Sequence, residues 1–381
     1  MTVMLAAACR TPFTGTDGAL AGWHPVDLSA SVMNEVIHRC GVAAESVDEV
    51  WVGCAEPVGA QGANMARAAV LSAGWSDRIG GIVVDSAEMS GSAALHAAVA
   101  AIMSGSADTV VVVGVSVASL VAPGASALNR VYGQPWGEGP ATRVAADGGL
   151  LPPPRAAEST AGLLGIDRVQ QDLAAARSVE RRRAADARCL LSVAAHPGSR
   201  LTAVRGTSVA ADEHREVADN PSELPPLFVA DGTVTAYSFA PPADGAAALL
   251  LTGGGPAAKG PPVADVLGVG RAAGSPLDAT GGVELALERA LSHAGVDTPD
   301  IARWEIVEST AAGLLSICHR LEVDPSTVNP DGGTLGVGDA GTAEELRLTV
   351  DGVSNAAPGE CVAAVSASPT GSAVTLWRRR T

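Results

Sequence analysis

Short apolar segments alternate with longer segments of helical periodicity along the first third of the chain. The apolar segments predict strands at residues 3–8, 47–53, 81–84 and 108–114. The segments between them have apolar residues at helical spacing or are rich in alanine, which predicts helices at residues 25–40, 64–73 and 90–103. Strands that are apolar rather than alternating are typical of a parallel or mixed sheet covered on both faces. The pattern therefore predicts an α/β fold.

The C-terminal part of the chain repeats this pattern. Strands are predicted at residues 246–252, 263–270, 304–307, 361–366 and 372–377, and helices at residues 283–294 and 311–321. Between the two parts, residues 116–154 are rich in glycine, proline, alanine and serine. This arrangement indicates two related halves that flank an insertion. We predict an N-terminal half from residues 1–115 and 206–255, an inserted loop domain from 116–205, and a C-terminal half from 256–381.

Helical signals return within the insertion from residue 156. One apolar helix face is predicted from the spacing of Leu163, Ile166, Val169 and Leu173. The basic run at residues 181–183 continues this region and is interpreted as the solvated face of a helix.

The composition narrows the class of protein. The chain has 381 residues, of which 47% are hydrophobic, so it is long enough for a large core in two or three domains. Its formal net charge is −16, and an acidic chain is a poor nucleic-acid binder. No apolar stretch is long enough to span a membrane without polar interruption. We therefore expect a cytoplasmic protein that binds neither nucleic acid nor membranes.

The cysteines lie in apolar segments, at Cys9, Cys40, Cys54, Cys189, Cys318 and Cys361. None of them has the CxxC or Cys/His spacing of a metal site, so no metal is expected. They are interpreted as reduced, buried thiols. His96, in the helix predicted at residues 90–103, is interpreted as a core residue. No glycine-rich phosphate-binding motif follows a predicted strand in the required context, so the residues alone predict no cofactor.

The turn between the strand at 81–84 and the following helix carries the main candidate residue, Glu88. A helix N-terminus presents unpaired backbone N–H groups and a partial positive charge, which stabilise an anion. Glu88 is therefore interpreted first as a structural anion at this helix N-terminus. Two alternatives stay open, a carboxylate nucleophile and a general base.

Ordered motifs run through the whole chain. They are Arg-Thr-Pro-Phe at 10–13, Gly-Ala-Asn-Met-Ala-Arg at 62–67, Ala-Glu at 157–158, Gly-Ile-Asp-Arg at 165–168, Asp-Gly-Thr-Val-Thr-Ala at 231–236, Asp-Gly-Ala-Ala at 244–247 and Val-Asn-Pro-Asp-Gly-Gly at 328–333. In this order the set resembles the thiolase family, over residues 1–381. The resemblance implies the thiolase fold, in which two α/β/α/β/α halves related by a pseudo-dyad carry an inserted loop domain. It also implies a homodimer or homotetramer.

The resemblance implies a reaction at coenzyme A thioesters. Thiolases use a low-pKa cysteine that takes the acyl group, a histidine that keeps this thiol ionised, and a second cysteine that moves a proton. At the matching positions this chain has Glu88 instead of the nucleophile and Asp339 instead of the histidine. The motif of the second cysteine aligns without gaps on residues 365–371, and Cys361 precedes it unless a local gap moves it.

Two supporting loops of the family are replaced as well. The Asn-Glu-Ala-Phe loop becomes Val-Glu-Ser-Thr at 307–310, which keeps the acid Glu308. The segment that helps to hold pantetheine in the family becomes residues 236–241, with the candidate contacts Tyr237, Ser238, Phe239 and Ala240. Tyr237 and Phe239 are larger than the family residues and are expected to fill the tunnel. Glu88, Asp339 and Glu308 are expected near one another, where clustered acids raise at least one pKa or bind a cation.

These replacements leave two hypotheses. The first is a protein without the Cys/His/Cys set, serving as a non-catalytic or regulatory subunit or as an acyl-CoA-type binding protein in lipid metabolism. It would assemble with itself or with an active thiolase-type partner. The second is an acyl-CoA acyltransferase or another enzyme of coenzyme A thioesters, a hydrolase or a transferase, that uses Glu88 and Asp339. Coenzyme A or an acyl-CoA is the ligand that the resemblance implies.

Overall fold

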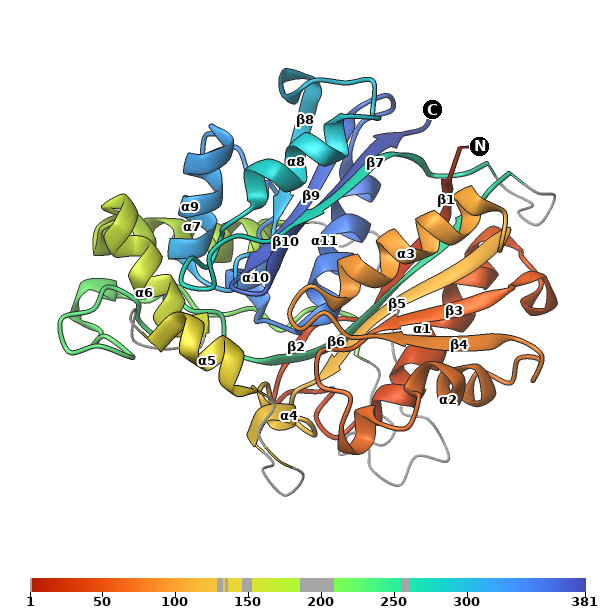
Figure 1. Cartoon of the computed structure of the whole chain (residues 1–381), viewed down its shortest axis with the longest axis horizontal. Coiled ribbons are helices and arrows are strands. Elements are labelled where there is room, and N and C mark those ends of the chain that lie inside the picture. Colours follow the sequence, from red (N-terminus) through yellow and green to blue (C-terminus); the bar gives the residue numbers. More distant parts are fainter. Residues whose placement is uncertain (1, 129–132, 134–135, 146–152, 186–208, 255–260) are drawn as a thin grey trace.

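A mixed sheet forms the centre of the protein (Figure 1). The structure is a computed structural model, and it describes all residues except 1, 129–132, 134–135, 146–152, 186–208 and 255–260. The described strands are β1 (Met4–Arg10), β2 (Thr14–Gly15), β3 (Glu49–Gly53), β4 (Gly80–Val84), β5 (Thr109–Val117), β6 (Ala243–Thr252), β7 (Ala264–Ala272), β8 (Ile301–Ile306), β9 (Cys361–Ser368) and β10 (Gly371–Arg379).

The helices lie on both faces of this sheet and in the segment between β5 and β6. The described helices are α1 (Pro25–Cys40), α2 (Met65–Ser72), α3 (Ser90–Ser104), α4 (Ala125–Leu128), α5 (Glu138–Val144), α6 (Pro153–Leu164), α7 (Arg168–Ala184), α8 (Val283–Leu291), α9 (Ala311–Leu321), α10 (Thr334–Val337) and α11 (Thr342–Asn355). Within the described residues, no helix combines the length and the apolar content needed to cross a membrane.

The sheet has the strand order β4-β3-β5-β6-β1-β7-β10-β9-β8. At one edge β4, β3 and β5 are parallel, and β6 is antiparallel to both β5 and β1. At the other edge β8 is parallel to β9, and β10 is antiparallel to β9 and β7. The two groups of strands join where Met4 and Leu5 of β1 pair with β7. The predicted mixed sheet is confirmed, and each half carries its parallel strands at the outer edge.

Three large hydrophobic clusters show how the layers are stacked. In the first, α1 and α2 pack on one face of the N-terminal strands. In the second, α3 and α11 lie together between the N-terminal and C-terminal strands, with Leu95 of α3 and Leu346 of α11 in one cluster. In the third, α7, α8 and α9 cover the outer face of the C-terminal strands. The five layers follow the order α/β/α/β/α, which confirms the predicted fold.

Two expectations for the insertion are wrong. The chain breaks between α6 and α7 at Gly165, whose φ of 65° lies in the left-handed region. Because of this break, Leu163, Val169 and Leu173 do not form a buried face, and their exposed fractions are 71%, 65% and 60%. The four apolar residues that predict one helix face therefore belong to two helices, α6 and α7, and to the turn between them.

The basic run at residues 181–183 is also not a solvated face as a whole. Arg182 is buried and forms salt bridges with Asp212 at 3.1 Å and Asp351 at 3.0 Å. Arg10 of β1 pairs with the same two carboxylates, at 2.8 and 2.7 Å. These ion pairs join α7 to β1 and to α11, and removing one member would leave buried charges without partners.

The central helix α11 has no counterpart among the predicted elements. It buries Glu344, Glu345, Arg347 and Asp351, although charged residues usually indicate a solvent-facing surface. Arg347 is compensated by Glu344 and, at 3.0 Å, by Asp351. The ion pairs explain how so polar a segment can lie between two layers of sheet.

Candidate functional site

The turn between β4 and α3 is held by short-range hydrogen bonds. Ser90 Oγ accepts a hydrogen bond from Ser86 N at 2.9 Å and donates one to the Ala87 carbonyl at 2.6 Å. Ala87 has a φ of 50°, a left-handed conformation that is uncommon for a residue with a Cβ. This conformation turns the chain sharply, so that residue 88 is presented just before the helix begins.

Glu88 is exposed and faces the hairpin between β9 and β10. Its Oε2 accepts hydrogen bonds from Thr370 Oγ1 at 2.9 Å and from Ser368 Oγ at 3.3 Å. Ser368 and Thr370 belong to residues 365–371, the run onto which the motif of the second catalytic cysteine aligns. The structure therefore brings two of the expected catalytic positions together, with a carboxylate and hydroxyls as their chemical groups.

The anion at the N-terminus of α3 is Glu345, from α11. The N-cap residue Met89 makes no side-chain capping bond. Instead Glu345 Oε2 accepts a hydrogen bond from Ser92 N at 2.5 Å. The sequence interpretation gave this role to Glu88, which bonds to the β9–β10 hairpin. Burial, together with the smaller effect of the nearby Asp339 charge, raises the pKa of Glu345 to about 7, against hydrogen bonds from Ser366 and Ser92.

Asp339 lies in the loop that precedes α11. Its carboxylate accepts hydrogen bonds from Ser309 Oγ at 2.7 Å and from Gly341 N at 2.8 Å. Burial raises the pKa of Asp339 to about 6, and the charges of Glu344 and Glu88 act in the same direction. Glu88 and Asp339 are thus close enough to interact electrostatically, as the sequence analysis expected of the two positions.

Glu308 is a buried structural residue and does not line an open site. It is only 2% exposed and accepts hydrogen bonds from Ser178 Oγ at 2.5 Å, Asn329 Nδ2 at 2.5 Å and Leu335 N at 3.3 Å. Burial raises the pKa of this carboxyl against those hydrogen bonds. Through these three donors, Glu308 ties α7, the loop at Asn329 and α10 to the segment just before α9.

The segment expected to contact coenzyme A passes beside α9. Ser238 Oγ accepts a hydrogen bond from Thr235 N at 2.9 Å, and Ala240 N donates one to the Ser309 carbonyl at 3.0 Å. Tyr237 is buried in the C-terminal cluster, where Arg215 stacks on its ring at 6.0 Å. Phe239 is half-buried and meets Phe228 edge to face at 5.8 Å. Of the two aromatic residues, Phe239 is the one whose ring lies outside the main clusters, so it is the better candidate for contact with a ligand.

Cys361 lies away from Glu88. Cys361 opens β9 and is paired with Arg378, whereas Ser368 closes the same strand, so this cysteine lies at the opposite end of β9 from Glu88. Burial raises the pKa of Cys361, and it raises that of Cys54 to about 11. The described cysteines are all buried and form no disulfide, as expected, and Cys189 lies outside the described residues. His96 is buried and shares a hydrogen bond with Thr375 at 2.9 Å, which confirms its place in the core.

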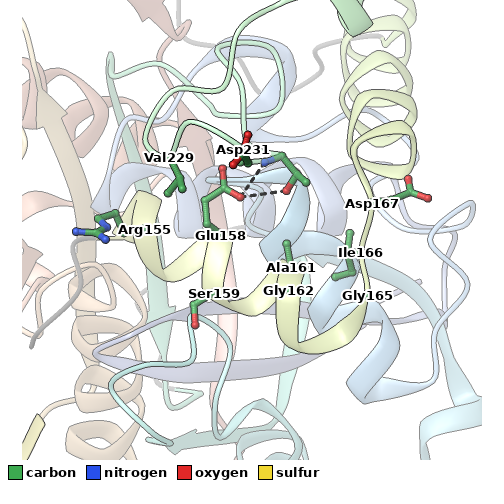
Figure 2. Close-up of a pocket in the computed structure, with 12 residues that line it drawn as sticks. Arg155, Glu158, Ser159, Ala161, Gly162, Gly165, Ile166, Asp167, Val229 and Asp231 are labelled. Carbon is green, nitrogen blue, oxygen red and sulfur yellow. Dashed lines mark hydrogen bonds between the residues drawn. The ribbon is translucent and has the colours of Figure 1, made fainter. Parts of the chain in front are cut away.

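Two cavities differ in character. An open groove of about 660 Å³ runs along α6 and the turn at residues 229–233. Figure 2 shows Glu158 on α6 in the wall of this groove, and its carboxylate accepts a hydrogen bond from Thr233 N at 2.9 Å. The second cavity is closed, holds about 10 Å³, and lies among α3, α11, β9 and β10, with Ser92, Glu345 and Ser366 in its wall. Within the described part of the chain, no group of three or more His, Cys, Asp or Glu residues could hold a metal ion.

Glu345 is the site residue that the sequence analysis missed. A usable signal was present, since Ala343, Leu346, Val350 and Val353 recur at helical spacing. That pattern would have predicted α11 and placed Glu345 in its first turns. The contact with Ser92 spans 253 positions in sequence, so no local pattern could have indicated it.

Known proteins and family models match this chain over most of its length. The family model for the N-terminal domain of thiolase matches residues 3–254, and that for the C-terminal domain matches residues 260–375. The mitochondrial acetyl-CoA acetyltransferase of Xenopus tropicalis is 30% identical over 352 residues, which are 88% of this chain and 82% of that protein. A steroid 3-ketoacyl-CoA thiolase of Mycobacterium tuberculosis is 29% identical over 341 residues, 87% of this chain and 82% of that protein.

Solved structures show the same similarity. The Acat5 thiolase of Ascaris suum, determined in complex with coenzyme A, superposes with a TM-score of 0.83 and 25% identity over 100% of both chains. The acetyl-CoA acetyltransferase of Bacillus anthracis superposes with a TM-score of 0.84 and 26% identity, over 100% of this chain and 99% of that one. The similarity covers both halves and the segment between them.

Proposed function

This chain belongs to the thiolase family, and we propose that it is a non-catalytic or regulatory member that does not carry out thiolysis or Claisen condensation. The observation that carries the proposal is Glu88. It stands where the family's acyl-accepting cysteine is expected, and its described partners are the hydroxyls of Ser368 and Thr370. Within the described residues, no cysteine or histidine hydrogen-bonds Glu88 or Asp339.

A carboxylate cannot take over the role of the cysteine. Transfer of an acyl group from a thioester to a carboxylate gives an anhydride, whereas a cysteine gives a second thioester that is poised for attack by a carbanion. The second step also needs a group that removes a proton from the α-carbon, and hydroxyls such as those of Ser368 and Thr370 are far weaker acids than a thiol. The residues at the site therefore support binding of an acyl-CoA-type ligand rather than turnover.

The test is a thiolysis assay on the purified chain. Acetoacetyl-CoA and longer 3-ketoacyl-CoA esters are supplied with free coenzyme A, and an active acetyl-CoA acetyltransferase under the same conditions is the positive control. We expect no turnover above the buffer rate. Turnover that exceeds background and disappears in Glu88→Gln would refute the proposal and would make Glu88 a catalytic residue.

A second candidate function rests on Asp339. Its pKa near 6 and its hydrogen bond from Ser309 make it suited to accept or release a proton at neutral pH, beside the exposed Glu88 carboxylate. A hydrolase or transferase acting on coenzyme A thioesters could use Glu88 as nucleophile and Asp339 as general acid-base. Release of free coenzyme A from acyl-CoA esters tests it, and Glu88→Gln and Asp339→Asn should each abolish the rate. If no ester is consumed while acyl-CoA still raises the melting temperature, the binding role is favoured.

We also propose that the chain assembles, either with itself or with an active thiolase-type subunit. The support is β4, which ends the sheet and, among the described strands, pairs with β3 alone. Its residues Ile82, Val83 and Val84 are only partly buried in the single chain, and an apolar edge strand favours pairing with another chain. The described cysteines are buried and form no disulfide, which supports the cytoplasmic location expected from the sequence.

Light scattering coupled to size-exclusion chromatography measures the assembly. We expect a dimer or a tetramer, and Ile82→Lys should shift the population toward monomer. Leu71→Lys on the neighbouring α2 is the matched control, because Leu71 is already 54% exposed. A monomer in the unmodified chain at micromolar concentration, with no added partner, would leave only assembly with a different subunit, which co-expression with an active thiolase then tests.

A further inference from the structure

A buried carboxyl group from a distant helix occupies the N-terminus of α3. Glu345 is 5% exposed, and its Oε2 takes the Ser92 N–H, one of the N–H groups in the first turn of α3 that have no partner within the helix. The N-cap residue Met89 offers no capping side chain. The helix end thus already has a carboxyl ligand, supplied by the same chain.

The fit around this carboxyl group is close. Glu345 Oε2 lies 2.6 Å from where a Cβ on Gly91 would stand, so only glycine fits at this point of the helix. Glu345 Oε1 has no hydrogen-bond partner among the described residues, although it is buried. The closed cavity of about 10 Å³ beside it has room for one water molecule at most. The carboxyl group therefore fills the site and leaves no space for a second anion.

No cation in the described part of the chain is paired with Glu345. The charged or titratable groups packed near it are Asp339 in the preceding loop, Glu344 with Arg347 on α11, Glu305 with Arg303 on β8, and His96 on α3. The two arginines are held by other acids, and His96 is bonded to Thr375. The charge of Glu345, when present, is stabilised by hydrogen bonds from the Ser366 hydroxyl on β9 and from Ser92 at the N-terminus of α3.

We propose that Glu345 is an internal anion that blocks the N-terminus of α3 and so withholds the stabilisation by the helix from any anion formed at position 88. A helix end carries a partial positive charge that lowers the pKa of a thiol placed beside it. A carboxylate already bound there cancels that charge and repels a second anion. The inference rests on the proposed function in one respect, since it takes position 88 as the nucleophile position of the family.

The experiment places a thiol at position 88 as a probe. The variants are E88C and E88C/E345Q, in which glutamine keeps an oxygen for Ser92 N but carries no charge. The rate of alkylation by iodoacetamide is followed against pH, and the labelled peptide is identified by mass spectrometry, so that labelling of the native cysteines is counted separately. In E88C we expect the thiol to titrate at or above its ordinary pKa of about 8.5. In E88C/E345Q we expect roughly tenfold more thiolate at the same pH, a shift of about one unit.

The pH dependence sharpens the result. Because Glu345 titrates near pH 7, the two variants should differ little at pH 6 and most above pH 7. Equal thiol pKa values in both variants would overturn the proposal, and so would a lowered pKa in E88C alone. Should E88C/E345Q fail to fold, E88C/E345A with and without formate replaces it, and formate must slow the alkylation by refilling the site. Turnover by the unmodified chain would refute the proposed function but would leave this pKa difference intact, so the two failures are distinguishable.

Discussion

The two halves of the molecule enter comparable helices in different ways. In the N-terminal half the turn after β4 leads through Glu88 into α3, and in the C-terminal half the turn after β8 leads through Glu308 into α9. Glu308 is buried among donors from three segments, whereas Glu88 is exposed and bonds to two hydroxyls. The second turn is therefore sealed into the core, and the first is open.

The N-termini of α3 and α9 are also capped in different ways. Thr310 caps α9 locally, because its side chain accepts a hydrogen bond from Gly313 N at 2.9 Å. For α3, Met89 makes no such bond and Glu345 reaches in from α11. One helix start is fixed by its own sequence and the other by tertiary structure. Substitutions at the C-terminal turn should therefore mainly affect stability, whereas substitutions of Glu88 at the N-terminal turn should mainly affect ligand binding.

The largest expected effect is at Glu308. Glu308→Ala removes an acceptor from three buried donors, and each unsatisfied donor is costly, so the free energy of unfolding should fall by about 3 kcal/mol. Chemical denaturation measures it, with the exposed Glu45→Ala as the control. If both variants unfold at the same denaturant concentration, Glu308 is not the structural residue that its contacts indicate.

The next effect concerns Glu345 and depends on pH. Burial holds the pKa of Glu345 at about 7, above its ordinary 4.5, so the native state resists ionisation of this group. Its contribution to stability is complete below pH 4.5 and is lost as the pH rises through 7. Glu345→Gln should therefore match the unmodified chain at pH 4.5 and exceed its stability at pH 8, by about 2 kcal/mol.

The comparison of the two chains at each pH isolates this group, because the other titrating carboxyls are common to both. Melting temperatures between pH 4.5 and pH 8.5 give the difference curve. A difference that stays constant over this range would mean that Glu345 does not titrate there, and a difference of opposite sign would mean that a cation stabilises its charge.

The same contrast explains how far the sequence could predict the structure. The bounds of α1 and α9 agree with the prediction at both ends, because apolar periodicity and local caps define them. The order of the motifs along the chain predicts that Glu88 lies at the turn before a helix. Its partners Ser368 and Thr370 lie 280 and 282 positions away, and no local pattern could have paired them with it.

Helix α11 was missed for a physical reason. Its buried charges look like a solvated surface until their partners, Arg10 on β1 and Arg182 on α7, are brought in by the fold. The interpretation of residues 181–183 as a solvated face failed for the same reason, since Arg182 faces Asp212 and Asp351. Charge predicts exposure only where the chain supplies no distant counterion.

A smaller effect is expected at the local cap of α9. Thr310→Ala removes the acceptor of the Gly313 N–H and should lower the free energy of unfolding by about 1 kcal/mol. Thr327→Ala is the control, because Thr327 is exposed and its hydroxyl bonds only to the Asp324 carbonyl. Hydrogen exchange should show faster opening of the first turn of α9 in Thr310→Ala and none in α3. Equal protection of that turn in both variants would show that tertiary packing, and not the cap, fixes the helix start.

The smallest effect is expected at Glu88 itself. In Glu88→Ala the exposed Thr370 hydroxyl loses an acceptor that water replaces, and the buried Ser368 hydroxyl keeps its hydrogen bond with Thr370 Oγ1 at 2.7 Å, so stability should change by no more than about 0.5 kcal/mol. A double-mutant cycle with Thr370→Ala measures the interaction directly, and the coupling should be equally small. If Glu88→Ala lowered the free energy of unfolding as much as Glu308→Ala, Glu88 would be a structural link between the two halves. If the stability of Glu88→Ala is unchanged, as we expect, the variant can be used to measure ligand binding. Any change in its affinity for acyl-CoA could then not come from a weakened fold.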